Sequence, residues 1–98
     1  MCKINLQNEM RNSVRNGFRG FFLCYQPIIN GKDYSLEGAE ALLRYHSPTR
    51  GVISPVEFIP ILEETEMICQ VGLWVLREAL KQCLDWRKLY PAFRMNVN

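Results

Sequence analysis

The sequence lacks several features on which common protein functions depend. It contains no run of 18 apolar residues, and no apolar segment follows the charged residues near its N-terminus. Neither a transmembrane helix nor a secretory signal peptide is therefore expected. With one histidine and no glycine-rich phosphate loop, no Ser-His-Asp set or common nucleotide-binding loop can be assembled. The net charge of +2 is too small to indicate binding to nucleic acid or to an anionic membrane.

The cysteines provide no metal-binding or disulfide pattern. Cys2, Cys24, Cys69 and Cys83 show no C-x-x-C spacing and have no partnering histidines, so a zinc site is not expected. Cys24 falls in a strand pattern and the last two fall in a helical pattern, which predicts buried free thiols. Free thiols favour a reducing compartment, and the cytoplasm is the expected location.

Length and composition are those of one ordinary globular domain at most. Of the 98 residues, 48% are apolar and 22% charged, so disorder is not expected. Residues 1–20 are locally basic, with four cations against the single acid Glu9. A basic amphipathic helix could contact a membrane or a partner, and a solvated helix face is the simpler interpretation.

The first half of the chain predicts a helix and two strands. Apolar residues recur mostly at four-residue spacing and indicate an amphipathic helix that ends near Gly17. This stripe consists of Ile4, Leu6, Met10, Val14 and Phe18. Residues 21–29 predict a strand, residues 30–33 a turn, and residues 34–45 a second strand. Because this connection is too short for a parallel crossover, the two strands should pair antiparallel.

The second half predicts two short helical segments, a long helix and a further strand. After a loop over residues 47–54, Ser54–Glu57 resembles a capping box with proline at the first helical position. Pro60 should end that helix, with a second one beginning nearby. Residues 69–89 predict an amphipathic helix and residues 93–98 an alternating strand. The helical stripe is Val71, Val75, Leu76, Ala79, Cys83 and Trp86. This order of elements is typical of the start of a β/α barrel.

Within the second strand, residues 37–44 read Glu-Gly-Ala-Glu-Ala-Leu-Leu-Arg. Since side chains alternate along a strand, Glu40, Leu42 and Arg44 should share one face, with the acid and the guanidinium about 13 Å apart along the strand. The carboxylate suits a hard divalent cation, and the guanidinium suits a phosphate. An ion pair at the end of a strand is the alternative interpretation.

The sequence motifs on either side of residues 37–44 make this pattern more specific than it is alone. Tyr25-Gln26-Pro27-Ile28 precedes them, and Ser54-Pro55-Val56-Glu57-Phe58-Ile59-Pro60, Glu63-Glu64-Thr65 and a final Asn96-Val97-Asn98 follow. In this order and spacing, residues 10–98 resemble the EAL family of cyclic di-GMP phosphodiesterases, which is named after a triplet matched by Glu40-Ala41-Leu42. The resemblance implies an α/β fold, an incomplete TIM-like barrel whose first two strands are antiparallel. It also implies that residues 1–18 form a helix leading into the domain and residues 19–98 its N-terminal portion.

The resemblance further implies roles for individual residues. Glu40 and Asn98 would bind metal, Mg²⁺ or Mn²⁺ in the complete domain. Arg44 would contact the phosphate of cyclic di-GMP, with Gln26 and Leu42 near the nucleotide. Such barrels take about 250 residues, and the family's later ligands, including its Asp-Asp-Phe-Gly block, have no counterpart here.

No complete catalytic set is therefore expected in this chain, which should be inactive alone although the complete domain would hydrolyse cyclic di-GMP to linear pGpG. The alternative is a non-enzymatic module that binds a ligand or a partner. Because an open barrel leaves strand edges unpaired, a homo-oligomer is expected.

Three positions are notable beside that pattern. Glu66 stands where the family usually has glycine. The loop conformation that is usual in the family is therefore less favourable at this position. Glu63, Glu64 and Glu66 could attract a cation, and a solvated acidic face is the simpler alternative. His46 is separated from the following proline by Ser47, and an exposed histidine without a catalytic role is expected.

Overall fold

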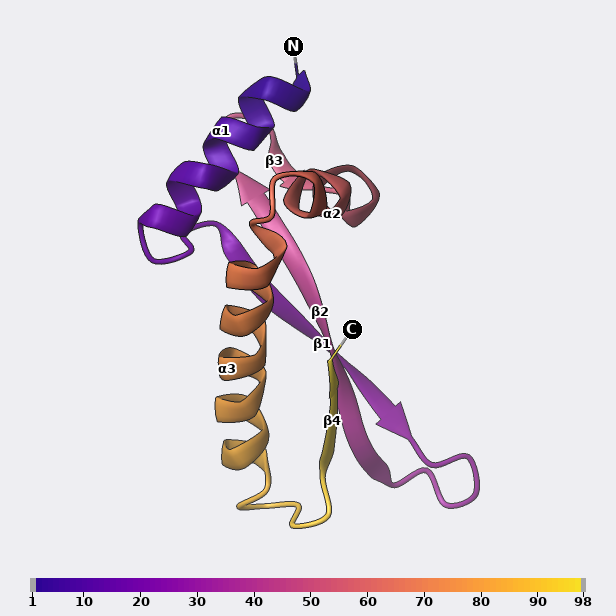
Figure 1. The fold of residues 1–98 in the computed structure, drawn as a ribbon. Helices are drawn as coiled ribbons and strands as arrows, with labels where there is room; N and C mark the ends of the chain where they lie inside the picture. Colours follow the sequence, from indigo (N-terminus) through magenta and orange to yellow (C-terminus); the bar gives the residue numbers. More distant parts are fainter. Residues whose placement is uncertain (1, 98) are drawn as a thin grey trace.

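The computed structural model describes residues 2–97, with side-chain surroundings described from Asn5 onward. Three helices and four strands follow one another along the chain (Figure 1). They are α1 (Cys2–Arg15), β1 (Phe21–Ile29), β2 (Leu36–Ser47), β3 (Gly51–Ile53), α2 (Pro55–Glu64), α3 (Ile68–Trp86) and β4 (Arg94–Val97).

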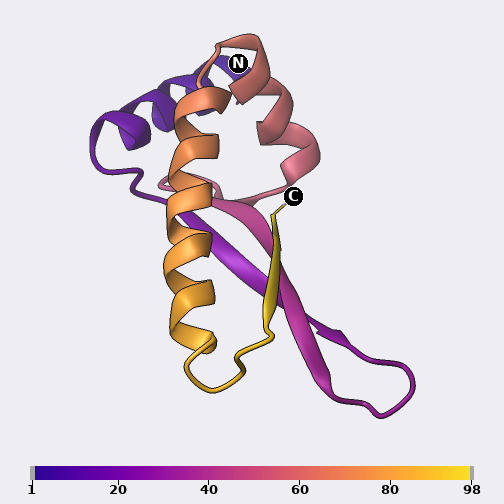
Figure 2. The same ribbon diagram turned by 60° about the horizontal axis from the view of Figure 1, so that its bottom comes forward.

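The long strand β2 organises the sheet. It pairs antiparallel with β1 along nearly its whole length, from Phe21 opposite Tyr45 to Ile29 opposite Leu36. Along its other edge β2 pairs in parallel with β4 and, at its end, antiparallel with β3. The predicted antiparallel start is thus confirmed, and β4, which follows α2 and α3 in the chain, adds a parallel strand. The β1–β2 hairpin extends away from the helices in both ribbon views (Figures 1 and 2).

Within residues 2–97, the helices pack on one face of this sheet only. The buried core joins all three helices to the Leu43 and Tyr45 face of β2. Its members are Leu6, Met10, Phe21, Leu43, Tyr45, Ile53, Phe58, Ile61, Leu62, Met67, Val71 and Val75. The Cα radius of gyration is 15.4 Å, compared with about 13 Å for a compact domain of this length. The molecule is therefore extended, as expected for an open portion of a barrel.

Polar contacts fasten α1 to the end of β2. Glu9 accepts hydrogen bonds from Ser47 Oγ and Thr49 Oγ1. The hydroxyls of Ser13 and Tyr45 are hydrogen bonded at 2.9 Å inside the core, and burial raises the pKa of the Tyr45 hydroxyl. The predicted helix is confirmed and ends before Gly17, which has a φ of +74°. Phe18, assigned to the helical stripe, lies beyond the helix and still packs against the core.

The prediction that Pro60 ends a helix is wrong, because α2 continues through it to Glu64. Proline inside a helix costs about 3 kcal/mol through a lost hydrogen bond and a steric clash. Burial of Phe58, Ile61 and Leu62 on the same helix contributes about 1.5–3 kcal/mol each. Packing of the helix therefore outweighs the break, and the proline is on the exposed side.

Two further local predictions need correction. Part of the predicted loop 47–54 is the short strand β3, paired with the end of β2. Ser54 does cap α2, accepting a hydrogen bond from the backbone N–H of Val56 at 3.3 Å. In a complete capping box, the Glu57 carboxylate would also accept a hydrogen bond from the backbone N–H of Ser54. Here that carboxylate instead accepts two hydrogen bonds from Arg50, at 2.7 and 3.0 Å. These bonds lower the pKa of the Glu57 carboxyl.

The long helix is shorter than predicted and exposes more of its stripe. It ends at Trp86, and Leu76, assigned to the buried stripe, is 55% exposed. The exposed leucines of α3 are Leu73, Leu76, Leu80 and Leu84. The cysteine prediction is half right: the three thiols described are free, but Cys24 and Cys69 are exposed and Cys83 is only partly buried. Cys2 lies outside the residues with described side chains.

Glu66 adopts the backbone conformation that glycine favours, with a φ of +63°. The loop between α2 and α3 therefore keeps a left-handed residue despite the glutamate. That conformation costs an L-residue about 1–2 kcal/mol. We expect Glu66→Gly to raise the free energy of unfolding by about 1 kcal/mol in urea denaturation. The matched control Glu63→Gly, inside α2, should lower it by a similar amount. Equal effects of the two substitutions would contradict the assigned strain.

Candidate functional site

The open face of β2 carries the residues predicted to act. Ala39, Ala41, Leu43 and Tyr45 are buried toward the helices, whereas Glu40, Leu42 and Arg44 are only half-buried. This alternation confirms that the acid, the leucine and the guanidinium share one face. Within residues 2–97, no helix covers that face, because the core lies on the other.

The sheet register aligns further residues with this face. Gln26 of β1 is opposite Glu40, and Asn96 of β4 is the Cα partner of Glu40 on the other side. Neighbours in register point to the same face of a sheet, so an amide flanks the carboxylate on each side. Cys24 is likewise opposite Leu42. Asn98, predicted as a metal ligand, lies outside the described residues.

Asn96 is a member of the row that the sequence reasoning did not select. The alternation of residues 93–98 already placed it on the face of Arg94 and Asn98. Which residues of β2 it would meet depends on the parallel β2–β4 register, for which the sequence contains no signal.

The acid and the guanidinium do not pair with each other. Within residues 5–97, the side chain of Glu40 makes no hydrogen bond or ion pair, and the Arg44 Nη1 donates to the carbonyl oxygen of Leu43 at 2.9 Å. The ion-pair interpretation is therefore not observed. Both charged groups remain available at the open face.

The donors on this face fit a hard divalent cation in kind but not in number. Glu40 provides carboxylate oxygens and its neighbours provide amide oxygens, the ligands that Mg²⁺ and Mn²⁺ prefer. Within the described part of the chain, no three histidine, cysteine or acidic side chains gather closely enough to hold a metal ion. The acidic stretch around Glu63 and Glu66 therefore forms no such cluster, and both side chains are exposed.

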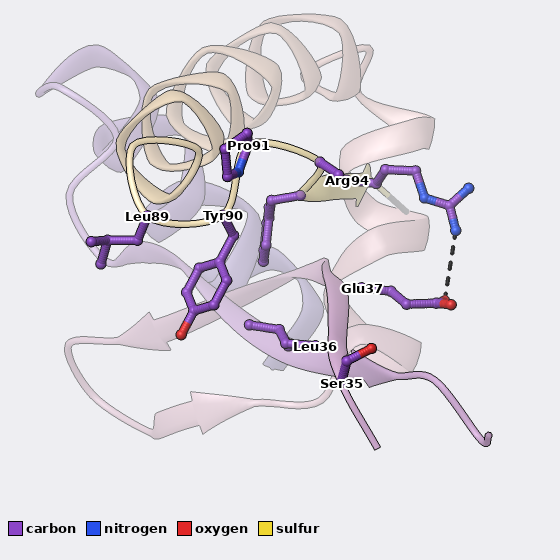
Figure 3. A pocket seen from close by; sticks show the side chains of 9 residues that line it. Ser35, Leu36, Glu37, Leu89, Tyr90, Pro91 and Arg94 are labelled. Atoms are coloured by element: carbon purple, nitrogen blue, oxygen red, sulfur yellow. Dashed lines mark ion pairs between the residues drawn. The ribbon is translucent and has the colours of Figure 1, made fainter. Parts of the chain in front are cut away.

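A cavity of about 460 Å³ lies elsewhere, between the start of β2 and the loop that joins α3 to β4 (Figure 3). Leu36, Tyr90 and Phe93 contribute apolar walls, and Glu37 and Arg94 form an ion pair at 3.7 Å beside them. Of the predicted site residues that the structure describes, none lines this cavity. Its chemistry is distinct from that of the open face.

Two sequence expectations concern the rest of the surface. His46 is exposed at the end of β2, and its backbone N–H donates to the carbonyl oxygen of Gly20 at 2.8 Å. Among the helices described, none is long and apolar enough to cross a membrane.

Comparison with known proteins identifies the family. The model of the EAL domain family matches residues 7–98. The chain belongs to the EAL domain family. A cyclic di-GMP phosphodiesterase of Pseudomonas aeruginosa is 39% identical over 79 residues, covering 81% of this chain and 14% of that protein. The bifunctional diguanylate cyclase/cyclic di-GMP phosphodiesterase MucR of the same species is 37% identical over 84 residues, covering 86% and 12%.

Solved EAL structures superpose on nearly all of the chain. The MucR phosphodiesterase in complex with c-di-GMP has a TM-score of 0.86 and 35% identity, and the match covers 96% of this chain and 38% of that one. The EAL enzyme Bd1971, in its cAMP- and cyclic-di-GMP-bound form, gives 0.79 and 36%, covering 98% and 27%. The predicted incomplete TIM-like barrel is thus confirmed. The chain spans about one seventh or less of these curated relatives and between a quarter and two fifths of these solved chains.

Proposed function

We propose that this segment is the N-terminal part of an EAL domain that hydrolyses cyclic di-GMP to linear pGpG in bacterial signalling. The observation that carries the proposal is the open face of β2, where Glu40, Leu42 and Arg44 share one side of the strand and Gln26 of β1 lies opposite Glu40. Two EAL proteins solved with this nucleotide superpose on the chain with TM-scores of 0.79 and 0.86, which supports the proposal.

Each residue of the face has a proposed role. Glu40, together with Asn98, holds a divalent cation, Mg²⁺ or Mn²⁺. Bound cations of this kind activate water and stabilise charge on a phosphodiester. Arg44 contacts a phosphate oxygen through a charge-assisted hydrogen bond, while Gln26 and Leu42 contact the nucleotide. The lack of a partner for Glu40 and the open side of Leu42 support these assignments.

We propose that the chain alone does not hydrolyse cyclic di-GMP. Hydrolysis at paired cations needs several ligands and a base held in one place, and the described residues supply one carboxylate on the open face. Incubation with excess Mg²⁺ or Mn²⁺ should yield no linear dinucleotide by chromatography. Turnover that disappears in Glu40→Gln would refute this proposal.

The activity itself is best tested in a chimera. Residues 7–98 can replace the matching segment of the MucR phosphodiesterase, with which they superpose at a TM-score of 0.86. We expect cyclic di-GMP hydrolysis that requires Glu40. A folded chimera that binds the nucleotide without hydrolysing it would instead favour the alternative, a non-enzymatic binding module.

We also propose that the isolated chain self-associates. Four exposed leucines line α3, and β4 pairs only with β2, which leaves its other edge unpaired among the described residues. Exposed edges and apolar patches are usually covered by association. Light scattering at tens of micromolar should give at least twice the 11.5 kDa of one chain. The double variant Leu76→Lys, Leu80→Lys should reduce that mass, and a stable monomer of the unmodified chain would contradict the proposal.

Two further assignments complete the proposal. Residues 1–18 lead into the domain and residues 19–98 form its first portion, a division supported by the end of α1 at Arg15 and the turn before β1. A cytoplasmic setting is supported by the three free thiols, of which two are exposed.

A further inference from the structure

A cluster of aromatic side chains lies on the face of the sheet that the helices cover. Tyr25 of β1, which is opposite the buried Ala41, contacts Trp86 at the end of α3. Trp86 in turn contacts Phe93, just before β4. The ring centroids are 5.0 and 5.3 Å apart, and both pairs meet edge to face, a preferred arrangement of aromatic rings. None of these rings takes part in the proposed hydrolysis.

These rings and Tyr90 line a cavity of about 200 Å³ between β1, β2 and the end of α3. The other lining residues are Pro27, Leu36, Gly38 and Ala39. The cavity shares Leu36, Tyr90 and Phe93 with the cavity of about 460 Å³ described above, so the two adjoin (Figure 3). An extended segment of several residues therefore has room to lie along both.

The charges around the smaller cavity favour a neutral ligand. Among the described residues, no charged side chain lines it. Arg87 donates from Nε to the carbonyl oxygen of Phe93 at 2.8 Å and so places a positive charge beside it. Glu78, whose charge acts on Tyr25, is itself paired with Lys81 at 3.1 Å. Aromatic rings attract cations, but here a cation would find no unpaired acid and would meet a nearby guanidinium.

Three of the lining side chains carry hydrogen-bond donors without a partner. Within residues 5–97, the indole N–H of Trp86 and the hydroxyls of Tyr25 and Tyr90 make no hydrogen bond. No buried side-chain nitrogen or oxygen among the described residues lacks a partner, so the donors of the half-buried Tyr25 and Trp86 reach solvent. Burial and the charge of Glu78 raise the pKa of the Tyr25 hydroxyl, which therefore stays protonated and able to donate. The cavity thus offers apolar walls together with free donors.

A proline-rich segment has the complementary chemistry. In the polyproline II conformation it presents apolar rings, has no N–H at its prolines, and leaves its carbonyl oxygens free of internal hydrogen bonds. Segments of this kind bind in grooves lined by aromatic side chains. No two of the five prolines in residues 1–98 are adjacent, so this stretch of chain does not itself supply such a segment.

We propose that the cavity lined by Tyr25, Trp86 and Tyr90 binds a proline-rich segment of a partner protein in the polyproline II conformation. The aromatic rings contact the prolines, while the indole N–H and the two hydroxyls donate to carbonyl oxygens of the segment. The site is independent of the proposed hydrolysis, because it lies on the opposite face of the sheet from Glu40.

The test titrates the full chain with N-acetylated, C-amidated hexaproline and follows its two indole N–H signals by NMR. Trp86 reports on the cavity. Trp74 is the internal control, because it stacks on Phe18 at 5.5 Å and lies about 18 Å earlier along α3, at 1.5 Å per residue. We expect a saturable shift of the Trp86 signal alone. A glycine–serine hexapeptide with the same end groups, which has no proline rings, should cause none.

Three variants test the recognition itself, with affinity read from the backbone amide of Phe93. Tyr90→Ala removes one wall at a side chain that is 48% exposed, so the fold should persist while binding weakens about ten-fold or more. Tyr90→Phe keeps the ring and removes only the hydroxyl, which should weaken binding about 2–10-fold. Tyr34→Ala is the control, since Tyr34 is 82% exposed in the loop between β1 and β2, and it should leave affinity unchanged.

The remaining outcomes would each overturn the proposal. Absence of a saturable Trp86 shift would mean that the cavity does not bind proline-rich segments, and equal shifts of both indoles would show non-specific association. If tetramethylammonium shifts the Trp86 signal and hexaproline does not, the cavity is a cation site. Equal affinity in Tyr90→Ala and Tyr34→Ala would place the peptide elsewhere on the chain. Unchanged affinity in Tyr90→Phe would refute the donor role of its hydroxyl.

Discussion

Replacing Glu40 by alanine in a complete EAL domain that carries this segment is expected to abolish hydrolysis of cyclic di-GMP. The substitution removes a carboxylate that has no structural partner among residues 5–97, so the loss should fall on cation binding and not on folding. Initial rates with Mg²⁺ and Mn²⁺, together with metal titrations, measure both effects. The thermal unfolding midpoint should stay close to that of the parent domain.

Two variants in the same strand separate the roles. Arg44→Ala should mostly weaken nucleotide binding, by about 1.5–3 kcal/mol, because it removes a charge-assisted phosphate contact. Glu37→Gln is the matched acidic control, since Glu37 alternates to the other side of β2 and pairs with Arg94. It should leave metal affinity unchanged. Equal loss of metal affinity in the Glu40 and Arg44 variants would contradict the assigned roles.

The elements that follow from local periodicity were predictable. The strand over residues 21–29 was predicted with the bounds it has, and the alternation along β2 correctly separated Glu40, Leu42 and Arg44 from the buried positions. Both depend on a period of two, which any sheet register preserves.

The partners across the strands were not predictable in the same way. A turn limited to residues 30–33 would pair Ile29 with Tyr34 and set Gln26 opposite Glu37. In the structure β2 begins at Leu36, Tyr34 has a φ of +60°, and the register shifts at Ile28 and Ile29. This longer loop is what brings Gln26 opposite Glu40. Register depends on loop conformation, which short-range patterns specify weakly.

The remaining errors come from tertiary packing. Helix α3 has apolar residues on more than one side, and periodicity alone cannot tell that Val71, Val75 and Ala79 are buried while Leu76 is exposed. Which side is covered depends on the neighbouring elements. For the same reason, packing of α2 overrides the helix-breaking tendency of Pro60.

Replacing Gly38 by alanine is expected to detach β4 from β2 and to destabilise the chain by about 3 kcal/mol or more. The new Cβ would lie 1.9 Å from the backbone oxygen of Arg94 and 2.9 Å from its carbonyl carbon. A backbone cannot rotate away as a side chain can, so the strands must separate. Urea denaturation should show the loss of stability, and hydrogen exchange should show faster exchange of the amides of β4.

Gly72→Ala is the matched control for this substitution. Gly72 lies in α3 with no atom within 4 Å of the added Cβ, and alanine in a helix is favoured over glycine by about 1 kcal/mol. The same chemical change should therefore stabilise the chain at one glycine and destabilise it at the other. Unchanged protection of β4 in Gly38→Ala would show that the close approach of the two strands is not required.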